Sequence, residues 1–244
     1  MLHLPRMLRS IENRNYRLYF FGQLVSLLGI WLQSVALAWL VYSLTGSSFQ
    51  LGLVVFIGQA PLLLLSPIGG VIADRYPRRW VVVATQTTSM LLAFVLAALA
   101  LRGHVHLRQI LAVAGLQGII NAIDVPTRQA LVSEIVDTDN LLNAVALNSS
   151  IFSNASSVAP LIAGFLVATV GEGWCFAING ATYLAVIVGL LMMRLEEHRK
   201  DRRTQSALSS VREGFHFVRD TAPIRRILVA LAVTANFMPT GIHT

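Results

Sequence analysis

The densest cluster of charged side chains between apolar runs in this 244-residue chain lies in one short segment, residues 70–79, with the sequence GVIADRYPRR. Asp74, Arg75, Arg78 and Arg79 place one carboxylate beside three guanidinium groups. No charged residue occurs in residues 51–73 before this cluster or in residues 80–101 after it. These carboxylate and guanidinium groups can form ion pairs and hydrogen bonds to helix ends. We therefore expect a tight charged turn between two apolar helices.

Asp124 is a second acid of interest, because it follows a further apolar segment. An isolated charge at the end of a membrane span is expensive and is usually paired. Arg75 or Arg78 could meet it across the end of a helical bundle, which would form a relay from Asp74 through an arginine to Asp124. Alternatively, Asp124 lies in interfacial water beside Arg128. We favour the relay.

Sets of residues that would indicate an enzyme are missing from the sequence. Cys175 is the one cysteine, which rules out an internal disulfide and a multi-cysteine metal site, and we expect it to be a small core residue. There is no Ser/His/Asp set, no metal-ligand spacing and no phosphate-binding glycine loop after a strand. We therefore predict no enzymatic activity, no catalytic residue, no metal and no cofactor.

The composition indicates a membrane protein. The chain is 55% hydrophobic and 13% charged, about half the charged share of a typical soluble domain. A net charge of +7 would suggest nucleic acid in a soluble protein. Here the basic residues lie in the gaps between apolar runs, so membrane topology explains them better. The expected partners are the lipid bilayer and a small-molecule substrate, and not nucleic acid.

Seven apolar segments are long enough to be considered membrane spans, which need about 20 residues each. The fourth starts near Leu107 and brings Asp124 close to its far end, and we expect Pro126 to end it because the residue before a proline avoids the helical region. The seventh runs uncharged to Thr244, the last residue given. The first six segments, in chain order, are residues 18–44, 51–73, 80–101, 107–123, 141–170 and 174–193.

The basic residues predict the orientation of these spans, because cytoplasmic loops carry an excess of Lys and Arg. All but two of the 19 basic residues fall in gaps on one side: residues 1–17, the turn after span two, a turn containing Arg128, and the loop after span six. Arg102 and Arg108 are on the other side. We therefore predict a multi-pass protein of the inner (cytoplasmic) membrane with a cytoplasmic N-terminus.

Polar residues inside the apolar segments are candidates for a central cavity. Several in the first segment fall along one face at helical spacing. Each one alone is more often a contact between helices than a substrate contact, but as a set they suggest a wet cavity. The candidates are Gln23, Ser26, Gln33 and Ser34 in span one, Gln59 in span two, Gln117 and Asn121 in span four, Asn148 and Asn154 in span five, and Asn179 in span six.

Six spans, a long basic loop and a further span resemble the major facilitator superfamily, whose members have two six-helix halves. Residues 70–79 resemble its signature turn between spans two and three: Gly70, Asp74, Arg75, Arg78 and Arg79 match, and Pro77 stands where glycine is usual. The resemblance implies a latch that favours the outward-facing state, with Gly70 permitting close helix approach. The alternative is that these arginines are ordinary positive-inside charges.

A second signature, NAIDVPTRQALVSEIV at residues 121–136, resembles the branch called transmembrane secretion effectors, which includes the enterobactin exporters. This resemblance covers about residues 13–193. Ala114 stands where drug exporters of the superfamily often carry an arginine, and the arginine of span five in relatives is also missing. From the sequence, no cavity arginine able to hold an anionic substrate is evident.

These features predict residues 1–17 as a cytoplasmic N-terminus, 18–194 as a six-helix bundle, 195–225 as a cytoplasmic loop and 226–244 as the start of a truncated second bundle. The loop is either an amphipathic helix on the membrane surface or a solvated linker. The resemblance implies a secondary active transporter that exports small amphipathic molecules by alternating access. The alternatives are a non-transporting remnant or scaffold, and a half-transporter that acts as a homo-dimer or with a second half.

Overall fold

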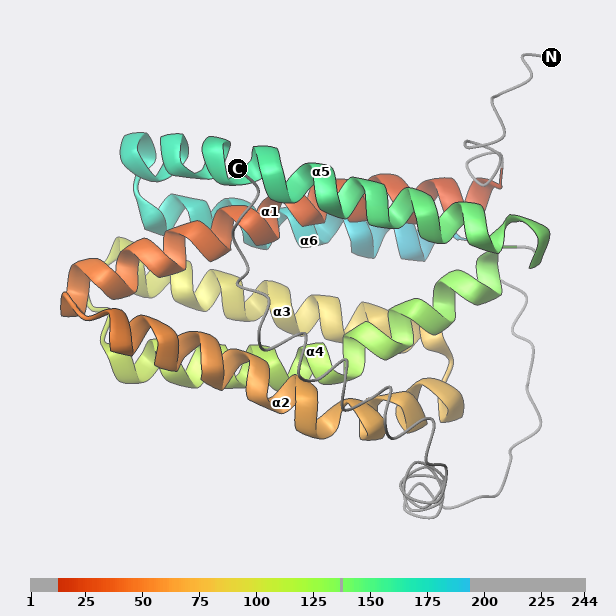
Figure 1. Ribbon diagram of the computed structural model, residues 1–244, viewed down its shortest axis with the longest axis horizontal. Coiled ribbons are helices and arrows are strands. Elements are labelled where there is room, and N and C mark those ends of the chain that lie inside the picture. The colour runs from red at the N-terminus through yellow and green to blue at the C-terminus, as the bar shows by residue number, and fades with distance from the viewer. Residues whose placement is uncertain (1–12, 137, 194–244) are drawn as a thin grey trace, which may run out of the picture. The chain divides into compact units, whose positions relative to one another are not determined.

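A computed structural model of the chain describes residues 13–136 and 138–193, and this part is a bundle of six α-helices (Figure 1). It contains no strand within those residues. The prediction of an all-α protein with a six-helix bundle is confirmed for the described residues. The helices are α1 (Arg14–Thr45), α2 (Ser48–Arg75), α3 (Arg78–Leu101), α4 (Leu107–Ile135), α5 (Thr138–Val170) and α6 (Glu172–Met192).

Five of these helices are long and apolar enough to cross a membrane, namely α1, α2, α3, α4 and α6. In the described part of α5 the apolar stretch, Ala155–Val170, is shorter. The predicted spans therefore coincide with helices throughout the described part of the chain. The predicted loop at 195–225 and the predicted seventh span at 226–244 lie outside the described residues, as does most of the N-terminal segment 1–17.

The connections between helices are short because specific residues end one helix and start the next. Asn13 caps α1, where its side chain accepts hydrogen bonds from the backbone N–H groups of Asn15 and Tyr16. Gly46, with φ of 59°, ends α1, and Ser47 then caps α2 through the N–H of Gln50. Two residues thus turn the chain back on itself, which sets neighbouring helices antiparallel.

Helices distant in sequence form the main contacts of the bundle. α6 packs between α1 and α3, α2 packs along α4, and α5 lies against α1 (Figure 1). Successive helices make fewer contacts, as α2 and α3 show. The fold is therefore held by pairings between the first three helices and the last three.

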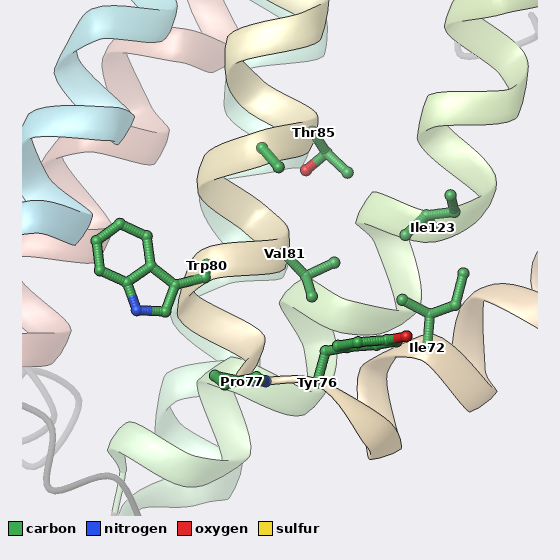
Figure 2. A pocket seen from close by; sticks show the side chains of 8 residues that line it. Ile72, Tyr76, Pro77, Trp80, Val81, Thr85 and Ile123 are labelled. Atoms are coloured by element: carbon green, nitrogen blue, oxygen red, sulfur yellow. The ribbon is translucent and has the colours of Figure 1, made fainter.

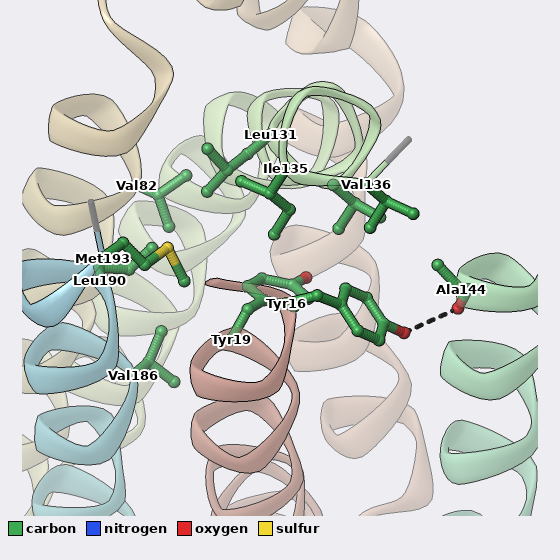
Figure 3. Packing of buried hydrophobic residues seen from close by; sticks show 11 residues of the cluster. Tyr16, Tyr19, Val82, Leu131, Ile135, Val136, Ala144, Val186, Leu190 and Met193 are labelled. Carbon is green, nitrogen blue, oxygen red and sulfur yellow. Dashed lines mark hydrogen bonds between the residues drawn. The ribbon is translucent and has the colours of Figure 1, made fainter. Parts of the chain in front are cut away.

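Two separate clusters of buried hydrophobic residues form the core, one at each end of the bundle. The first gathers around Tyr16 and Tyr19 of α1 and includes Val82, Leu131 and Leu190 (Figure 3). The hydroxyl of Tyr16 donates a 3.0 Å hydrogen bond to the backbone carbonyl of Ala144 in α5, as Figure 3 shows. This bond satisfies the one polar group of a side chain that is otherwise packed in apolar surroundings.

The second cluster lies at the other end of the same helices. Its members include Leu32 and Val41 of α1, Leu96 of α3, Ile110 of α4 and Phe176 of α6. Cys175 belongs to this cluster and is fully buried, which confirms the expectation that it is a core residue. In α1, α3, α4 and α6 the segment between the two clusters is left for polar side chains.

Pro126 was expected to end the fourth helix, and this prediction is wrong. α4 continues from Leu107 to Ile135 with Pro126 inside it. A proline within a helix removes the hydrogen bond to the carbonyl four residues earlier, which here belongs to Ala122. Inside a membrane bundle, neighbouring helices can compensate for such a freed group, so the helix persists.

The neighbour that approaches this freed carbonyl is Gly69 of α2, and not Gly70 as the resemblance implied. A β-carbon at Gly69 would overlap the carbonyl oxygen of Ala122, whereas one at Gly70 would meet no atom within 4 Å. The two residues differ because successive positions of a helix point about 100° apart. The contact lets α2 and α4 approach at backbone distance.

This contact predicts opposite effects for two adjacent glycines. Gly69→Ala should lower the free energy of unfolding by about 1–3 kcal/mol, because the added methyl group forces α2 and α4 apart. Gly70→Ala should be neutral or stabilising by up to about 1 kcal/mol, because alanine favours a helix over glycine. Thermal unfolding in detergent can be followed by the reaction of a thiol-specific dye with buried Cys175. Equal midpoints for the two variants would contradict the assigned contact.

Candidate functional site

Polar side chains fill the level of the bundle between the two apolar clusters, and we call this set the polar layer. Each of four helices passes from one cluster, through polar residues, to the other cluster. The layer consists of Gln23, Ser26 and Gln33 of α1, Thr85, Gln86 and Ser89 of α3, Gln117, Asn121, Asp124 and Arg128 of α4, and Asn179 and Thr182 of α6.

The centre of the polar layer is an ion pair between Asp124 and Arg128, one turn apart on α4. Asp124 is 3% exposed. One of its carboxylate oxygens accepts hydrogen bonds from the hydroxyl of Thr85 at 2.6 Å and from the amide of Gln86 at 3.0 Å. The other oxygen accepts from Arg128. Three donors from two helices therefore hold a buried carboxylate, as its charge requires.

Arg128 also connects this pair to α1. Its Nη1 donates a 2.6 Å hydrogen bond to the side-chain oxygen of Gln23. The ion pair thus joins α1, α3 and α4 through side chains alone. The expectation that Arg128 lies in a turn is wrong: because α4 continues past Pro126, the arginine lies within the helix and its side chain is only 17% exposed.

The favoured relay from Asp74 through Arg75 or Arg78 to Asp124 differs from the observed contacts. Asp124 pairs with Arg128, the alternative partner, but it does so inside the bundle and not in interfacial water. Arg78 extends toward the far end of α4 instead, where it meets Glu134 at 3.2 Å. The reason is again the length of α4. Because the helix continues past Pro126, Glu134 and not Asp124 lies beside the charged turn.

Two further hydrogen bonds of the polar layer cross between helices, one from Gln117 to Ser89 and one from Asn179 to Gln33. The amide of Gln117 donates to Ser89 of α3 and to Asn121, both at 3.0 Å. Asn179 of α6 donates to Gln33 of α1 at 2.5 Å. Ser26 is fully buried, and its hydroxyl has no partner among the described residues. Most cavity candidates of α1, α4 and α6 therefore act in this structure as contacts between helices.

Other cavity candidates fall outside this network. Gln59 of α2 and Ser34 of α1 are exposed. Asn148 and Asn154 lie within α5, but their side chains are outside what the structure describes. Sequence reasoning missed Thr85, Gln86 and Ser89, although three polar residues on one face of an uncharged span were a usable indication.

The charged turn between α2 and α3 fastens the end of α4 through Arg78. The guanidinium of Arg78 donates to the backbone carbonyl of Ala130 at 2.9 Å and to Glu134 at 3.2 Å, and it lies 3.5 Å from Asp74. Asp74 itself is largely exposed. One arginine thus binds the turn and α4 together, at the C-terminal part of a helix where cations are favoured.

Arg79 makes the corresponding contact to α6. Its Nη2 donates a 2.7 Å hydrogen bond to the carbonyl of Leu191 in the last turn of that helix. Its guanidinium carbon also lies 5.4 Å from the ring centre of Trp80, within the range of a cation–π interaction. Two successive arginines therefore tie the same turn to two different helix ends.

An apolar groove of about 370 Å³ lies beside the charged turn, between α2, α3 and α4 (Figure 2). Ile72 and Tyr76 form one side, Val81 and Thr85 belong to α3, and Ile123 belongs to α4. The Thr85 hydroxyl that donates to Asp124 thus sits at the junction of the groove and the polar layer. Within the described residues no group of three or more His, Cys, Asp or Glu side chains could hold a metal ion.

Comparison with known proteins gives a consistent result. The profile of a family described as transmembrane secretion effector matches residues 7–239. The staphyloferrin A transporter of Staphylococcus aureus is 30% identical over 70% of this chain and 43% of its own length. The enterobactin exporter EntS of Shigella flexneri is 27% identical over 83% of this chain and 49% of its own. The chain spans about half the length of the curated relatives it matches.

A third similar protein is an uncharacterized transporter of the major facilitator type, YfiS of Bacillus subtilis. It is 25% identical over 81% of this chain and 48% of its own length.

The ion pair predicts an asymmetry among charge-removing variants. Asp124→Asn should destabilise the bundle by about 3–5 kcal/mol, because it leaves the buried charge of Arg128 without a carboxylate. The double variant Asp124→Asn/Arg128→Gln should recover most of that loss. Glu134→Gln is the matched control on the same helix: its carboxylate is part-exposed, so about 0–1 kcal/mol is expected.

These three proteins can be compared by thermal unfolding with the dye reaction at Cys175. A double variant that is no more stable than Asp124→Asn would show that the missing charge partner is not the cause of the loss.

Proposed function

Because the chain belongs to the transmembrane secretion effector family, a branch of the major facilitator superfamily of membrane transporters, we propose that it serves in secondary active export of small amphipathic molecules by alternating access. In such transporters, substrate binds near the membrane midplane between two six-helix halves, each built from 3+3 inverted repeats. The six helices described here would form one such half. The names of its relatives make enterobactin and staphyloferrin A the first compounds to test as substrates.

The observation that carries this proposal is the attachment of the charged turn to the ends of α4 and α6. Arg78 and Arg79 bind Ala130, Glu134 and Leu191 across the bundle, so the turn is fastened to the bundle at two helix ends. Asp74 projects from the same turn and its side chain is 78% exposed, where a second half could engage it. We assign Asp74, Arg75, Arg78 and Arg79 to a latch that biases the inward and outward states.

In this proposal the six-helix bundle needs a second bundle as its partner, since the substrate lies between two halves. A second copy of this chain, another chain and a longer continuation of the same chain are the three sources of that partner. Co-purification of two differently tagged copies would support the homo-dimer. Recovery of one tag alone would exclude it.

We also propose that the protein lies in the inner membrane with its N-terminus in the cytoplasm, since nearly all basic residues fall on one side of the spans. Alkaline phosphatase, which is active only after export, should be active when fused after Gly103 and inactive when fused after Tyr76. The reverse pattern would overturn the orientation. Equal cell levels of the two fusions provide the control.

The latch can be tested by the energised uptake of fluorescent amphipathic dyes into everted membrane vesicles. Arg78→Gln should reduce uptake about fivefold or more, because a coupling of 1–3 kcal/mol between the turn and the bundle is lost. Arg102→Gln is the matched control, since Arg102 follows α3 at its opposite end and is exposed. Its uptake should stay within about twofold of the unaltered chain.

A chain that is inserted in the membrane but gives no energised uptake of any dye would contradict the transport proposal. An equal loss of uptake in both variants would contradict the latch.

A further inference from the structure

The two residues of the buried ion pair differ in how many of their polar atoms have a hydrogen-bond partner. Both carboxylate oxygens of Asp124 accept hydrogen bonds, from Thr85, Gln86 and Arg128. A guanidinium carries five N–H donors in a rigid planar fork. Arg128 uses Nη2 for Asp124 and Nη1 for Gln23, while its Nε is buried and has no acceptor among the described residues. The unused hydrogen-bonding capacity therefore belongs to the cation.

Access to the pair also favours the cation. The side chain of Arg128 is 17% exposed, and that of Asp124 is 4% exposed. Arg128 is therefore the more accessible partner of the pair. A cationic ligand would have to reach past Arg128 to a carboxylate whose oxygens are already occupied, whereas an anion needs no such rearrangement.

The surroundings of Arg128 suit an anion that also carries an apolar or aromatic part. Tyr19 and Tyr183 are the other ionisable side chains close to the guanidinium, and both are almost fully buried. Both carry an aromatic ring, which suits a ligand with an apolar or aromatic part. The neutral amide oxygen of Gln23 accepts a hydrogen bond from Arg128, and a charged ligand can displace it.

We propose that Arg128 is the anion-binding residue of this bundle, and that Asp124 is an internal carboxylate that occupies it when no ligand is bound. The ligand class is a small organic anion with a planar oxyanion, above all a carboxylate, because the guanidinium fork matches this shape with paired hydrogen bonds. This inference rests on the proposed export function and names the substrate class for it.

Competition with Asp124 should lower the affinity of the chain for a carboxylate ligand. An incoming carboxylate gains charge-assisted hydrogen bonds to Arg128 only as Asp124 gives them up. Binding to the unaltered chain should therefore be weak. It should become stronger when the internal competitor is neutralised, although the protein is then less stable without ligand.

Anthranilate, a fluorescent aromatic carboxylate, is a suitable probe, and 2-aminobenzamide is its neutral counterpart with the same ring. Binding can be measured by fluorescence titration of the purified 244-residue chain in lipid nanodiscs. Asp124→Asn should bind anthranilate about tenfold tighter than the unaltered chain, which corresponds to one hydrogen bond to a charged group. The double variant Asp124→Asn/Arg128→Gln should lose this gain completely.

Two controls separate the site from general effects. Glu172→Gln removes a carboxylate at the start of α6, so it should leave anthranilate binding within about twofold of the unaltered chain. The affinity of 2-aminobenzamide should be the same in all of these proteins. Tighter binding of the neutral amide in Asp124→Asn would show that the variant only opens an apolar gap.

Gln23→Leu keeps the inference testable if Asp124→Asn does not fold. This variant retains both charges but removes the second acceptor of Arg128, so anthranilate should bind about threefold tighter. Folding of every variant is checked by circular dichroism and by the protection of Cys175 from the thiol dye. Unchanged anthranilate affinity in a folded Asp124→Asn or Gln23→Leu protein would overturn the proposal.

The outcome is distinguishable from that of the export function because binding requires no energised membrane. Anthranilate binding that depends on Arg128, in a chain that takes up no dye, would support the anion site and contradict transport. Dye uptake by a chain that binds anthranilate and the amide equally would support transport and overturn the anion site.

Discussion

The buried pair of Asp124 and Arg128 is the interaction on which the middle of the bundle depends. The hydrocarbon core of a membrane offers no water, so polar groups there must find partners within the protein. The pair meets this condition by recruiting Thr85 and Gln86 from α3 and Gln23 from α1. Those bonds fix how three helices rotate about their own axes, because each donor or acceptor must face the same point.

The apolar clusters at the two ends support this arrangement. They exclude lipid and solvent above and below the polar layer, and they use the same helices to do so. Small residues then decide which helices can come close enough, as the contact between Gly69 and the Ala122 carbonyl illustrates. Apolar packing sets the positions of the helices, and the polar layer sets their rotation.

Much of the fold was accessible from the sequence because long uncharged runs in a membrane protein leave few alternatives to helices. The turn at residues 76–77 and the burial of Cys175 followed from the pattern. The site was less accessible, since Pro126 and Arg128 resemble the end of a span. Whether a proline ends a helix depends on the neighbouring helix that compensates its missing hydrogen bond, and sequence spacing does not contain that neighbour. The bonding of Arg78 to Glu134 instead of Asp124 is a consequence of the same error in length.

The two arginines of the charged turn have a consequence for the order of biosynthesis. The acceptor of Arg79 is the carbonyl of Leu191, which follows it by 112 residues. When the last residue of α3 is added to the chain, neither that acceptor nor the α4 carbonyl that Arg78 binds has yet been made. The guanidinium of Arg78 gains its acceptor once α4 has been made, whereas that of Arg79 must remain hydrated until α6 has been synthesised almost to its end. The charged turn is therefore fastened in two steps, first to α4 and last to α6.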